Sequence, residues 1–294
     1  MITVPPSFRA MPRWWHDDAG RGWLDVLPGG VAARCAAWGL VVDGEPAHGS
    51  NALVVPVRRG DERLALRLAP PGDDVAGEVR ALRVWAGRGT VLLVDADEGE
   101  GATLLERLDG GRSLADEPLD VAVEVLAGLT RTLAVPAPDD VPSTAAIAAG
   151  MAESFPREWA ELGEPLPSRQ LDVALDLAAE RGAAPTSSLA VDGDLHHDQV
   201  LAGMRAPWLV VDPVLWRGDP EADLARVLWT RLDELPSERD VVAAFDAFVR
   251  ASGVPRDRAR AWVVLRATSY LLWGLAHGLT EDPVRCRRLL DVFV

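Results

Sequence analysis

Short apolar runs mark the chain between positions 40 and 108. Several of them are rich in β-branched residues or alternate apolar with polar side chains, which is typical of β-strands. Two of the runs are joined by Arg58-Arg59-Gly60-Asp61, a sequence that favours a hairpin turn. One stretch, 74–86, has apolar residues at helical spacing and predicts a helix. The five predicted strands are 40–42, 52–57, 63–68, 90–95 and 103–108.

A longer helical pattern at 22–38 precedes these strands. Pro28-Gly29-Gly30 falls inside it, and because proline and glycine disfavour helix interiors, we expect a break there. Beyond Gly110-Gly111 the pattern becomes mainly helical, which predicts an α+β fold with a strand-rich first part. The later predicted helices are 119–133, 145–162, 171–181 and a run from 222 to the C-terminus, with short strands at 189–191, 200–202 and 208–211.

Charge and composition restrict the chemistry. The 294 residues include 45 acidic and 30 basic side chains, a formal net charge of −15, which argues against nucleic acid or an anionic membrane as a partner. All the basic residues are arginine. The chain therefore has neither a Schiff-base lysine nor a P-loop with its phosphate-binding lysine.

Cysteine usage and hydropathy bear on the compartment. Cys35 and Cys286 are too few for a disulfide framework or a thiolate zinc site, and we expect two reduced thiols. The first residues lack an apolar core of signal-peptide length, and the most apolar late stretch, 261–279, is interrupted by Arg266 and His277. The sequence therefore predicts a cytoplasmic protein.

The most informative segment is a polar loop between short apolar strands, residues 191–201. Within it Asp194 and Gln199 are five residues apart, the spacing of the aspartate and asparagine in the catalytic loop of kinases. Asp212 ends the next strand, where a second metal-binding aspartate belongs. Phosphoryl transfer requires Mg²⁺ on hard oxygen ligands and a carboxylate that accepts the proton of the attacking hydroxyl. Gln199 and Asp212 suit the metal, and Asp194 suits the role of the base.

Two other interpretations of this loop stay open on the residues alone. Aspartates in a surface turn cap backbone N–H groups without any catalytic role. The cluster Asp194, His196, His197 and Asp198 has the residue types of a zinc hydrolase site, although the other three histidines are not at ligand spacing.

The loop and its surroundings resemble the kinase-like antibiotic phosphotransferases, specifically the aminoglycoside and hydroxyurea resistance kinase family. The family pattern H-G-D-L-H-x-x-N-V-L, then W-L-x-I-D-P and G-(D/E)-x-x-x-D, is similar to 192–201, 208–213 and 218–223. The resemblance implies a two-lobed protein-kinase-like fold, with a mainly β N-lobe and a helical C-lobe that bind ATP and Mg²⁺ in the cleft between them. The implied boundaries are 1–105 for the nucleotide-binding lobe, 106–112 for the hinge and 113–294 for the C-terminal lobe.

The resemblance also implies roles for residues at matching positions. Asp194 is then the catalytic base, and Gln199 and Asp212 are the Mg²⁺ ligands. His196 and Asp223 support the catalytic loop. The implied nucleotide contacts are Arg67, its helix partner Glu78, the shortened glycine loop Gly49, Ser50 and Asn51, and the backbone of Glu106, Arg107 and Leu108.

Three positions depart from the family pattern. Arg67 replaces the phosphate-binding lysine, Asp192 the loop histidine and Gln199 the metal-binding asparagine. Gln199 keeps the amide oxygen on a longer stem. In Leu64-Ala65-Leu66-Arg67-Leu68 the leucines share one strand face, so Arg67 points to the other, toward the expected nucleotide. Arginine keeps the charge and can bind both Glu78 and phosphate, but its planar fork is not equivalent to lysine.

The predicted reaction is transfer of the γ-phosphate of ATP to a hydroxyl of a small polar molecule. The leading acceptor is a cationic aminoglycoside such as streptomycin, on the resemblance and the acidic charge. Trp216, Asp219 and Glu221 follow the metal-binding aspartate and are candidate acceptor contacts. A kinase of a sugar or amino sugar has the same catalytic residues, and a catalytically degenerate nucleotide-binding module would explain Arg67 and Asp192 together.

Overall fold

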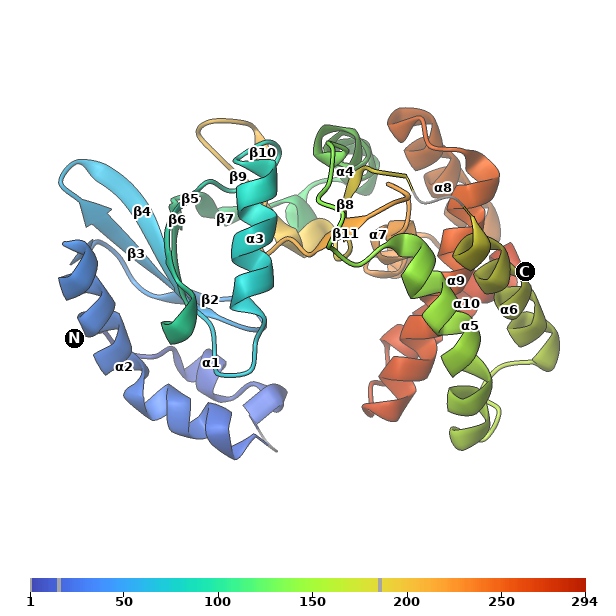
Figure 1. The fold of residues 1–294 in the computed structure, drawn as a ribbon, viewed down its shortest axis with the longest axis horizontal. Coiled ribbons are helices and arrows are strands. Elements are labelled where there is room, and N and C mark those ends of the chain that lie inside the picture. Colours follow the sequence, from blue (N-terminus) through green and yellow to red (C-terminus); the bar gives the residue numbers. More distant parts are fainter. Residues whose placement is uncertain (1, 15–16, 185–186) are drawn as a thin grey trace. The chain divides into compact units, whose positions relative to one another are not determined.

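The computed structural model describes residues 2–14, 17–184 and 187–294 (Figure 1). It divides into two compact units, Met1–Gly110 with Ala202–Leu209 and Gly111–Leu201 with Val210–Val294. The boundary between the units falls within three short strands: β7 (Asp109–Ser113), β9 (Val200–Ala202) and β10 (Trp208–Val210). The predicted α+β class, with a β-rich N-terminal lobe and a helical C-terminal lobe, is confirmed.

The segment 202–209 groups with the first unit, whereas the sequence-based boundaries assign it to the C-terminal lobe. The physical reason is Arg205 at the tip of this segment. Its guanidinium donates hydrogen bonds to Gly87 O, Thr90 O and the carboxylate of Glu106, all in the first unit.

The first unit is built on an antiparallel sheet. Its strand order is β1-β3-β4-β6-β5, and β2 pairs with β3. The predicted hairpin turn is present: Arg59 pairs with Glu62, and Gly60 between them has a φ of 60°, which glycine adopts without strain. The strands are β1 (Val41–Val42), β2 (Ala47–His48), β3 (Leu53–Arg59), β4 (Glu62–Leu68), β5 (Leu93–Asp97) and β6 (Ala102–Glu106).

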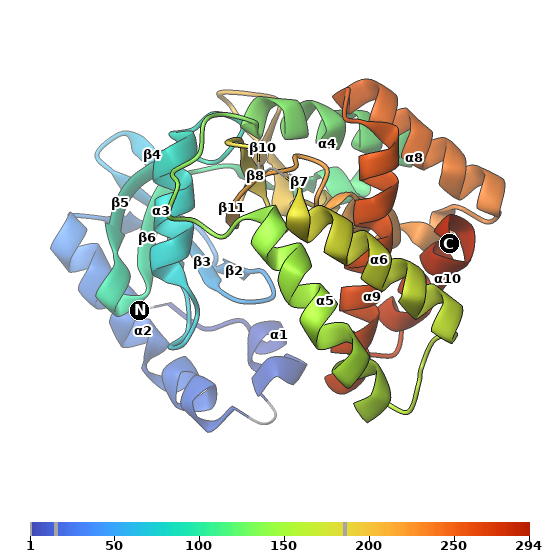
Figure 2. The same ribbon diagram turned by 45° about the vertical axis from the view of Figure 1, so that its right-hand side comes forward.

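Helices α2 (Asp18–Trp38) and α3 (Val75–Trp85) cover opposite faces of this sheet (Figures 1 and 2). Leu64 and Leu66 of β4 lie in one apolar core with residues of α2. The next residue of the strand, Arg67, points to the other face and pairs with Glu78 of α3. The alternation of side chains along β4 therefore separates an apolar face from a charged one. A short helix, α1 (Pro6–Arg9), precedes α2.

The predicted break in α2 is wrong. Pro28 lies inside a continuous helix, although proline has no N–H for the carbonyl four residues before it. That carbonyl, Leu24 O, accepts a hydrogen bond from Arg9 Nη2 at 3.0 Å. The side chain of Arg9 supplies the donor that Pro28 lacks.

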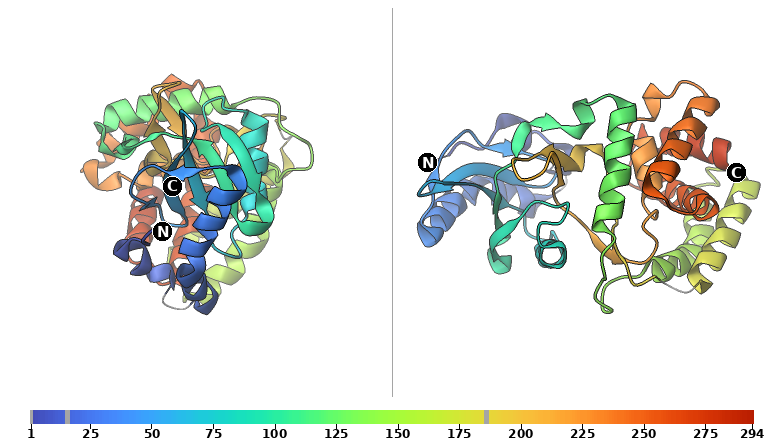
Figure 3. Two further views of the ribbon diagram at one scale, coloured as in Figure 1. Left: turned by 90° about the vertical axis from the view of Figure 1, so that its left-hand side faces the viewer. Right: turned by 90° about the horizontal axis from the view of Figure 1, so that it is seen from above.

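The second unit is mainly helical, with a small sheet in which β8 (Ala190–Asp192) pairs with β11 (Leu215–Arg217). α9 supplies much of its core, including Trp262, Leu265 and Leu271. α5 and α6 lie side by side in both main views, and Figure 3 shows the helices from two further directions. The helices are α4 (Leu119–Leu133), α5 (Thr144–Glu161), α6 (Ser168–Ala183), α7 (Leu224–Trp229), α8 (Glu238–Ser252), α9 (Arg256–Ala276) and α10 (Asp282–Phe293). Within the described part of the chain, no helix combines the length and hydropathy needed to cross a bilayer.

Candidate active site

The polar loop predicted to be catalytic connects β8 to β9 in the second unit. Its first anchor is Asp192, at the end of β8. Asp192 Oδ1 accepts hydrogen bonds from the backbone N–H of Asp194 at 3.1 Å and of Val214 at 3.0 Å. One carboxylate oxygen therefore ties the start of the loop to the segment that follows Asp212.

Gln199 brings the three predicted catalytic and metal-binding residues together. Its Nε2 donates to Asp194 Oδ2 at 2.9 Å and to the backbone oxygen of Asp212 at 3.2 Å. Because both partners are acceptors, the amide nitrogen must point to them, and Oε1 points elsewhere. Oε1 is buried and has no hydrogen-bond partner among the described residues. Asp212 has a φ of 50°, a left-handed conformation that costs about 1–3 kcal/mol in a residue other than glycine and is frequent at functional sites.

The residues present fit a divalent cation. The orphaned amide oxygen of Gln199 and the carboxylate of Asp212 are hard oxygen donors, and Mg²⁺ commonly takes only one or two protein ligands beside substrate phosphates. A zinc site is not supported, since no group of three or more His, Cys, Asp or Glu in the described ranges is arranged to hold a metal.

The two loop histidines have structural partners. His197 is fully buried, and its Nδ1 lies 2.9 Å from Thr230 Oγ1, whose hydroxyl donates to Arg226 O. Burial lowers the pKa of His197 to about 4, so the ring is neutral at pH 7 and Nδ1 is the donor. His196 Nδ1 accepts the backbone N–H of Asp198 at 3.3 Å and caps the short 3₁₀ turn. Both rings hold the loop in shape.

Arg226 of α7 contacts the predicted base and was missed by the sequence analysis. Its Nη1 lies 3.0 Å from Asp194 Oδ1, while Gln199 binds the other carboxylate oxygen. Asp194 keeps 31% of its side chain exposed, so it is oriented on both oxygens and still open to a ligand. Arg226 stands 32 residues further along the chain, and nothing in the local pattern marks it.

Asp223 and Arg266 form a second anchor of the loop. Asp223 Oδ1 accepts from Arg266 Nε at 2.8 Å, and Arg266 Nη2 donates to Gly193 O at 3.4 Å. The Arg266 guanidinium also lies over the ring of Trp216, 5.1 Å from its centroid. A Cβ at position 193 would come within 2.3 Å of that ring, so glycine is required where Trp216 packs against the loop.

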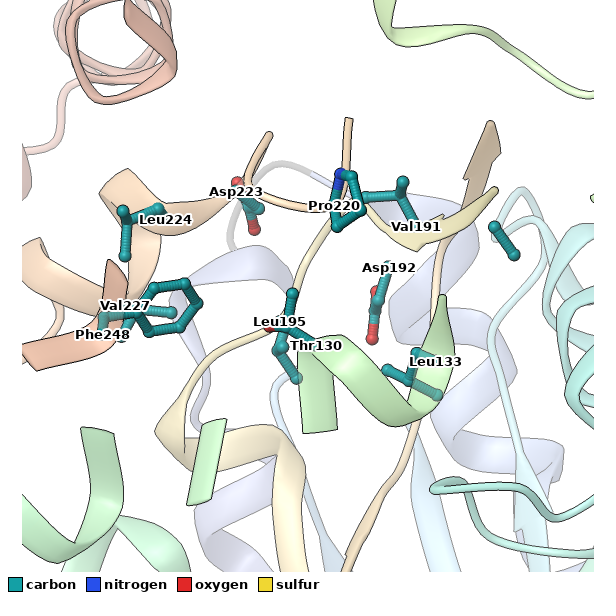
Figure 4. A pocket seen from close by; sticks show the side chains of 11 residues that line it. Thr130, Leu133, Val191, Asp192, Leu195, Pro220, Asp223, Leu224, Val227 and Phe248 are labelled. Carbon is teal, nitrogen blue, oxygen red and sulfur yellow. The ribbon is translucent and has the colours of Figure 1, made fainter. Parts of the chain in front are cut away.

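Asp192 and Asp223 also line a small cavity of about 10 Å³ beneath the loop (Figure 4). Its other walls are mostly apolar, among them Leu195 and Phe248. Oδ2 of each aspartate is buried without a hydrogen-bond partner in the part of the chain described. Burial raises the pKa of Asp192 to about 8 and that of Asp223 to about 6. The cavity is about large enough for one water molecule between the two carboxyl groups.

The three residues predicted to contact the acceptor have other partners in the fold. Trp216 supports the catalytic loop, as described above. Glu221 is fully buried and paired with Arg258. Asp219 accepts a hydrogen bond from Trp262 Nε1 at 2.8 Å and is also buried. Because buried carboxylates require such partners, Asp219 and Glu221 serve the core of the second unit, and we leave them out of the acceptor site.

In the first unit, Arg67 and Glu78 form a buried ion pair. Arg67 Nη1 lies 2.7 Å from Glu78 Oε2, and the two side chains are only 7% and 9% exposed. Arg67 occupies a central strand, between Val54 of β3 and Thr103 of β6. The arginine thus forms the strand-to-helix pair that the resemblance implies for a lysine.

Gly49, Ser50 and Asn51 belong to the exposed turn between β2 and β3. The N–H of Gly49 donates to Ala52 O at 3.2 Å, so this group is used within the turn. Asn51 Oδ1 accepts a hydrogen bond from Arg13 Nη1 at 2.7 Å. Nothing in the local sequence marks Arg13, because its partner stands 38 residues away.

The predicted hinge residues are held by their side chains. Glu106 N–H donates to Leu92 O at 2.9 Å, and its carboxylate binds Arg205. Arg107 Nε donates to Leu64 O at 3.0 Å, and its guanidinium pairs with Asp43. The N–H of Glu106 is therefore already used within the first unit.

Comparison with known proteins agrees with this geometry. Residues 37–278 match the Aminoglycoside/hydroxyurea antibiotic resistance kinase family. A streptomycin 6-kinase of Streptomyces glaucescens is 36% identical over 291 residues, which cover 96% of this chain and 94% of the relative. A hydroxyurea phosphotransferase of Kitasatospora aureofaciens is 39% identical over 290 residues, covering 97% of this chain and 84% of the relative.

Among solved structures, a ternary complex of aminoglycoside phosphotransferase APH(4)-Ia with AMP-PNP and hygromycin B is similar, with a TM-score of 0.65. The match covers 89% of this chain and 97% of that chain at 18% identity. The fold and the loop constellation define a small-molecule kinase of the protein-kinase-like fold. The chain belongs to the aminoglycoside/hydroxyurea antibiotic resistance kinase family.

Proposed function

We propose that this kinase transfers the γ-phosphoryl group of ATP to a hydroxyl of an aminoglycoside, with streptomycin-like aminocyclitols as acceptors. The observation that carries the proposal is the arrangement of Gln199. Its amide nitrogen links Asp194 to the backbone of Asp212, and its amide oxygen is left buried without a partner. In a kinase, the residue at this position binds the metal. The amide oxygen of Gln199 is free for that role, while its amide nitrogen orients the base.

The chemistry follows from these residues. The acceptor oxygen forms a bond to the γ-phosphorus, the bond from that phosphorus to the bridging oxygen of ADP breaks, and the hydroxyl proton passes to Asp194. Gln199 and Arg226 hold the two carboxylate oxygens of Asp194 in place. Gln199 Oε1 and the Asp212 carboxylate would hold Mg²⁺, which, when bound, neutralises charge on the phosphates.

We assign nucleotide binding to the first unit. Arg67, fixed by Glu78, supplies positive charge to the α- and β-phosphates. Asn51 and its turn cover the phosphates, and the backbone of Arg107 and Leu108 receives the adenine. The intact Arg67–Glu78 pair supports an active kinase over a degenerate binding module, because the substitution of arginine for lysine preserves the contact.

The test of the base is Asp194→Asn, with Asp198→Asn as the matched control on the same loop. Asp198 is 70% exposed. We expect Asp194→Asn to lower kcat by about 10²–10⁴-fold while ATP binding, measured by calorimetry, stays near normal. Asp198→Asn is expected to keep kcat within about threefold. Turnover by Asp194→Asn within tenfold of the wild type would contradict the assignment.

The acceptor is identified by ADP release across a panel. We expect release with streptomycin and little with glucosamine or neutral sugars. Release with glucosamine alone would identify an amino-sugar kinase, and ATP binding without release on any acceptor would favour the degenerate module.

A further inference from the structure

Four aromatic side chains of the second unit lie in a row that begins at Arg226, the ion-pair partner of Asp194. Trp229 stacks on Tyr270 with ring centroids 4.6 Å apart, Tyr270 lies 5.3 Å from Trp273, and Trp273 stacks on His277 at 4.4 Å. We call Trp229, Tyr270, Trp273 and His277 the aromatic ladder. Its last three members come from α9 and the residue that follows it.

The face of α9 that carries the ladder reaches the catalytic loop through Arg266. Arg266, Tyr270, Trp273 and His277 are spaced by three or four residues and therefore share one face of α9. Arg266 at one end of this face donates to Gly193 O. From Arg266 the helical rise is about 10 Å to Trp273 and about 16 Å to His277. The face has the length of a molecule of two or three sugar rings.

The outer end of the ladder is exposed. Trp229 is buried at 1% exposure, whereas Trp273 is 47% exposed and His277 is also exposed. The His277 ring is fixed by a hydrogen bond from Nδ1 to Trp273 O at 2.7 Å. A large exposed aromatic surface that is held rigidly suits a ligand with an apolar or cationic face.

The charges around the ladder favour a cation. The Arg226 guanidinium already lies over the rings of Trp229 and Tyr270, at 6.0 and 5.7 Å from their centroids, so the cluster accommodates a guanidinium group. Immediately after His277, the turn into α10 contributes two carboxylates. These two carboxylates are Glu281 and Asp282. Together with Asp233 they form ion pairs with a single arginine, Arg285. Three carboxylates around one arginine give the segment that follows His277 an excess of negative charge.

We propose that the exposed end of the aromatic ladder binds the cationic part of the acceptor, with Trp273 as the residue that determines specificity. The inference rests on the proposed function, because it places the acceptor hydroxyl at Asp194. It deepens that function by distinguishing a cationic, multi-ring acceptor from a small neutral one such as hydroxyurea, which spans too little of α9 to reach Trp273. Cation–π contacts of this kind attract a cation to the face of an aromatic ring.

The test compares Trp273→Ala, the conservative Trp273→Phe, and Val284→Ala as a control. Val284 is an exposed apolar residue on α10. Streptomycin is titrated into each protein without ATP by calorimetry, and steady-state KM values for streptomycin and ATP follow. We expect Trp273→Ala to weaken streptomycin binding and raise its KM about tenfold, with KM for ATP unchanged. Trp273→Phe should recover most of the loss, and Val284→Ala should match the wild type.

The outcomes separate this inference from the proposed function. If streptomycin is phosphorylated and Trp273→Ala binds it as the wild type does, the ladder proposal is wrong and the function stands. If streptomycin binds in a Trp273-dependent way without being phosphorylated, the ladder is supported and the proposed function fails. If the wild type binds no streptomycin but phosphorylates hydroxyurea, the ladder proposal is overturned.

Discussion

Replacing Asp192 by asparagine tests whether the Asp192 carboxyl group, which anchors the catalytic loop, is protonated in the folded protein. Asparagine keeps the oxygen that accepts from the N–H groups of Asp194 and Val214. Its amide nitrogen replaces Oδ2, which lacks a partner within the described residues and faces the small cavity. Asp192→Asn therefore reproduces the protonated form of the native residue and removes its titration.

The magnitude follows from the pKa of Asp192, which burial raises from 3.8 to about 8. Between these values the folded protein holds a proton that the unfolded chain has released. Unfolding then releases a proton, and stability falls as the pH rises through this window. For one proton the slope is about 1.4 kcal/mol per pH unit, or about 3 kcal/mol between pH 5 and pH 7. The stability of Asp192→Asn relative to the wild type should increase by that amount over the same range.

The assay is urea unfolding followed by tryptophan fluorescence at several pH values. The control is Asp198→Asn, because the neighbouring side chain of His196 lowers the pKa of Asp198. The contribution of the Asp198 carboxylate to stability is therefore lost only as the pH falls through that lowered pKa. Its curve should run parallel to the wild type between pH 5 and pH 7. Parallel curves for Asp192→Asn and the wild type over this range would refute the reasoning, since they would show that Asp192 is ionised in the fold.

Two further predictions concern the first unit. Arg67→Lys should keep the KM for ATP within about threefold in steady-state kinetics, and a well-folded but inactive variant would show that the planar guanidinium has a role of its own. Arg67→Met leaves Glu78 buried without its cation. It should therefore lower the free energy of unfolding by about 3–5 kcal/mol, as measured by thermal unfolding. Arg205→Ala removes the hydrogen bonds to Gly87, Thr90 and Glu106 and should raise the KM for ATP about five- to tenfold with little change in kcat. The control for Arg205→Ala is Met204→Ala, because the side chain of Met204 is 98% exposed. Equal KM values for ATP in the two variants would contradict the expectation that Arg205 supports nucleotide binding by holding Glu106.

Elements whose determinants are local in sequence were predictable. The helix expected at 74–86 is α3, Val75–Trp85, and Asp74 caps it by accepting the N–H of Gly77 at 2.9 Å. The hairpin at Gly60 follows from a glycine at a position of positive φ. The five-residue spacing of Asp194 and Gln199 marked both as catalytic candidates, and their side chains are in contact in the structure. In each case the residues that decide the geometry are within a few positions of one another.

Features decided by distant residues were not predictable. The continuity of α2 through Pro28 depends on Arg9, a residue from a preceding helix. The partner of Asp194 on its second oxygen, Arg226, comes from α7. The acidic residues Asp219 and Glu221 looked available for a cation, but Trp262 and Arg258 of α9 already bind them. A sequence pattern shows which residues carry charge and does not show which charges are already paired.

The departures from the family pattern bear on whether the kinase is active. If the protein were a catalytically degenerate module, Arg67 and Asp192 should have lost the contacts that an active kinase needs at these positions. Instead, Arg67 keeps the ion pair with Glu78. Asp192 anchors the loop by accepting two backbone N–H groups. The longer stem of Gln199 lets one amide nitrogen reach both Asp194 and the backbone of Asp212. Because each of the three residues is held by defined partners, Arg67 in the first unit and Asp192 and Gln199 in the loop around Asp194, the departures argue for an active kinase. Arg226 is then the residue that completes the setting of Asp194, because its guanidinium holds one carboxylate oxygen while the Gln199 amide holds the other.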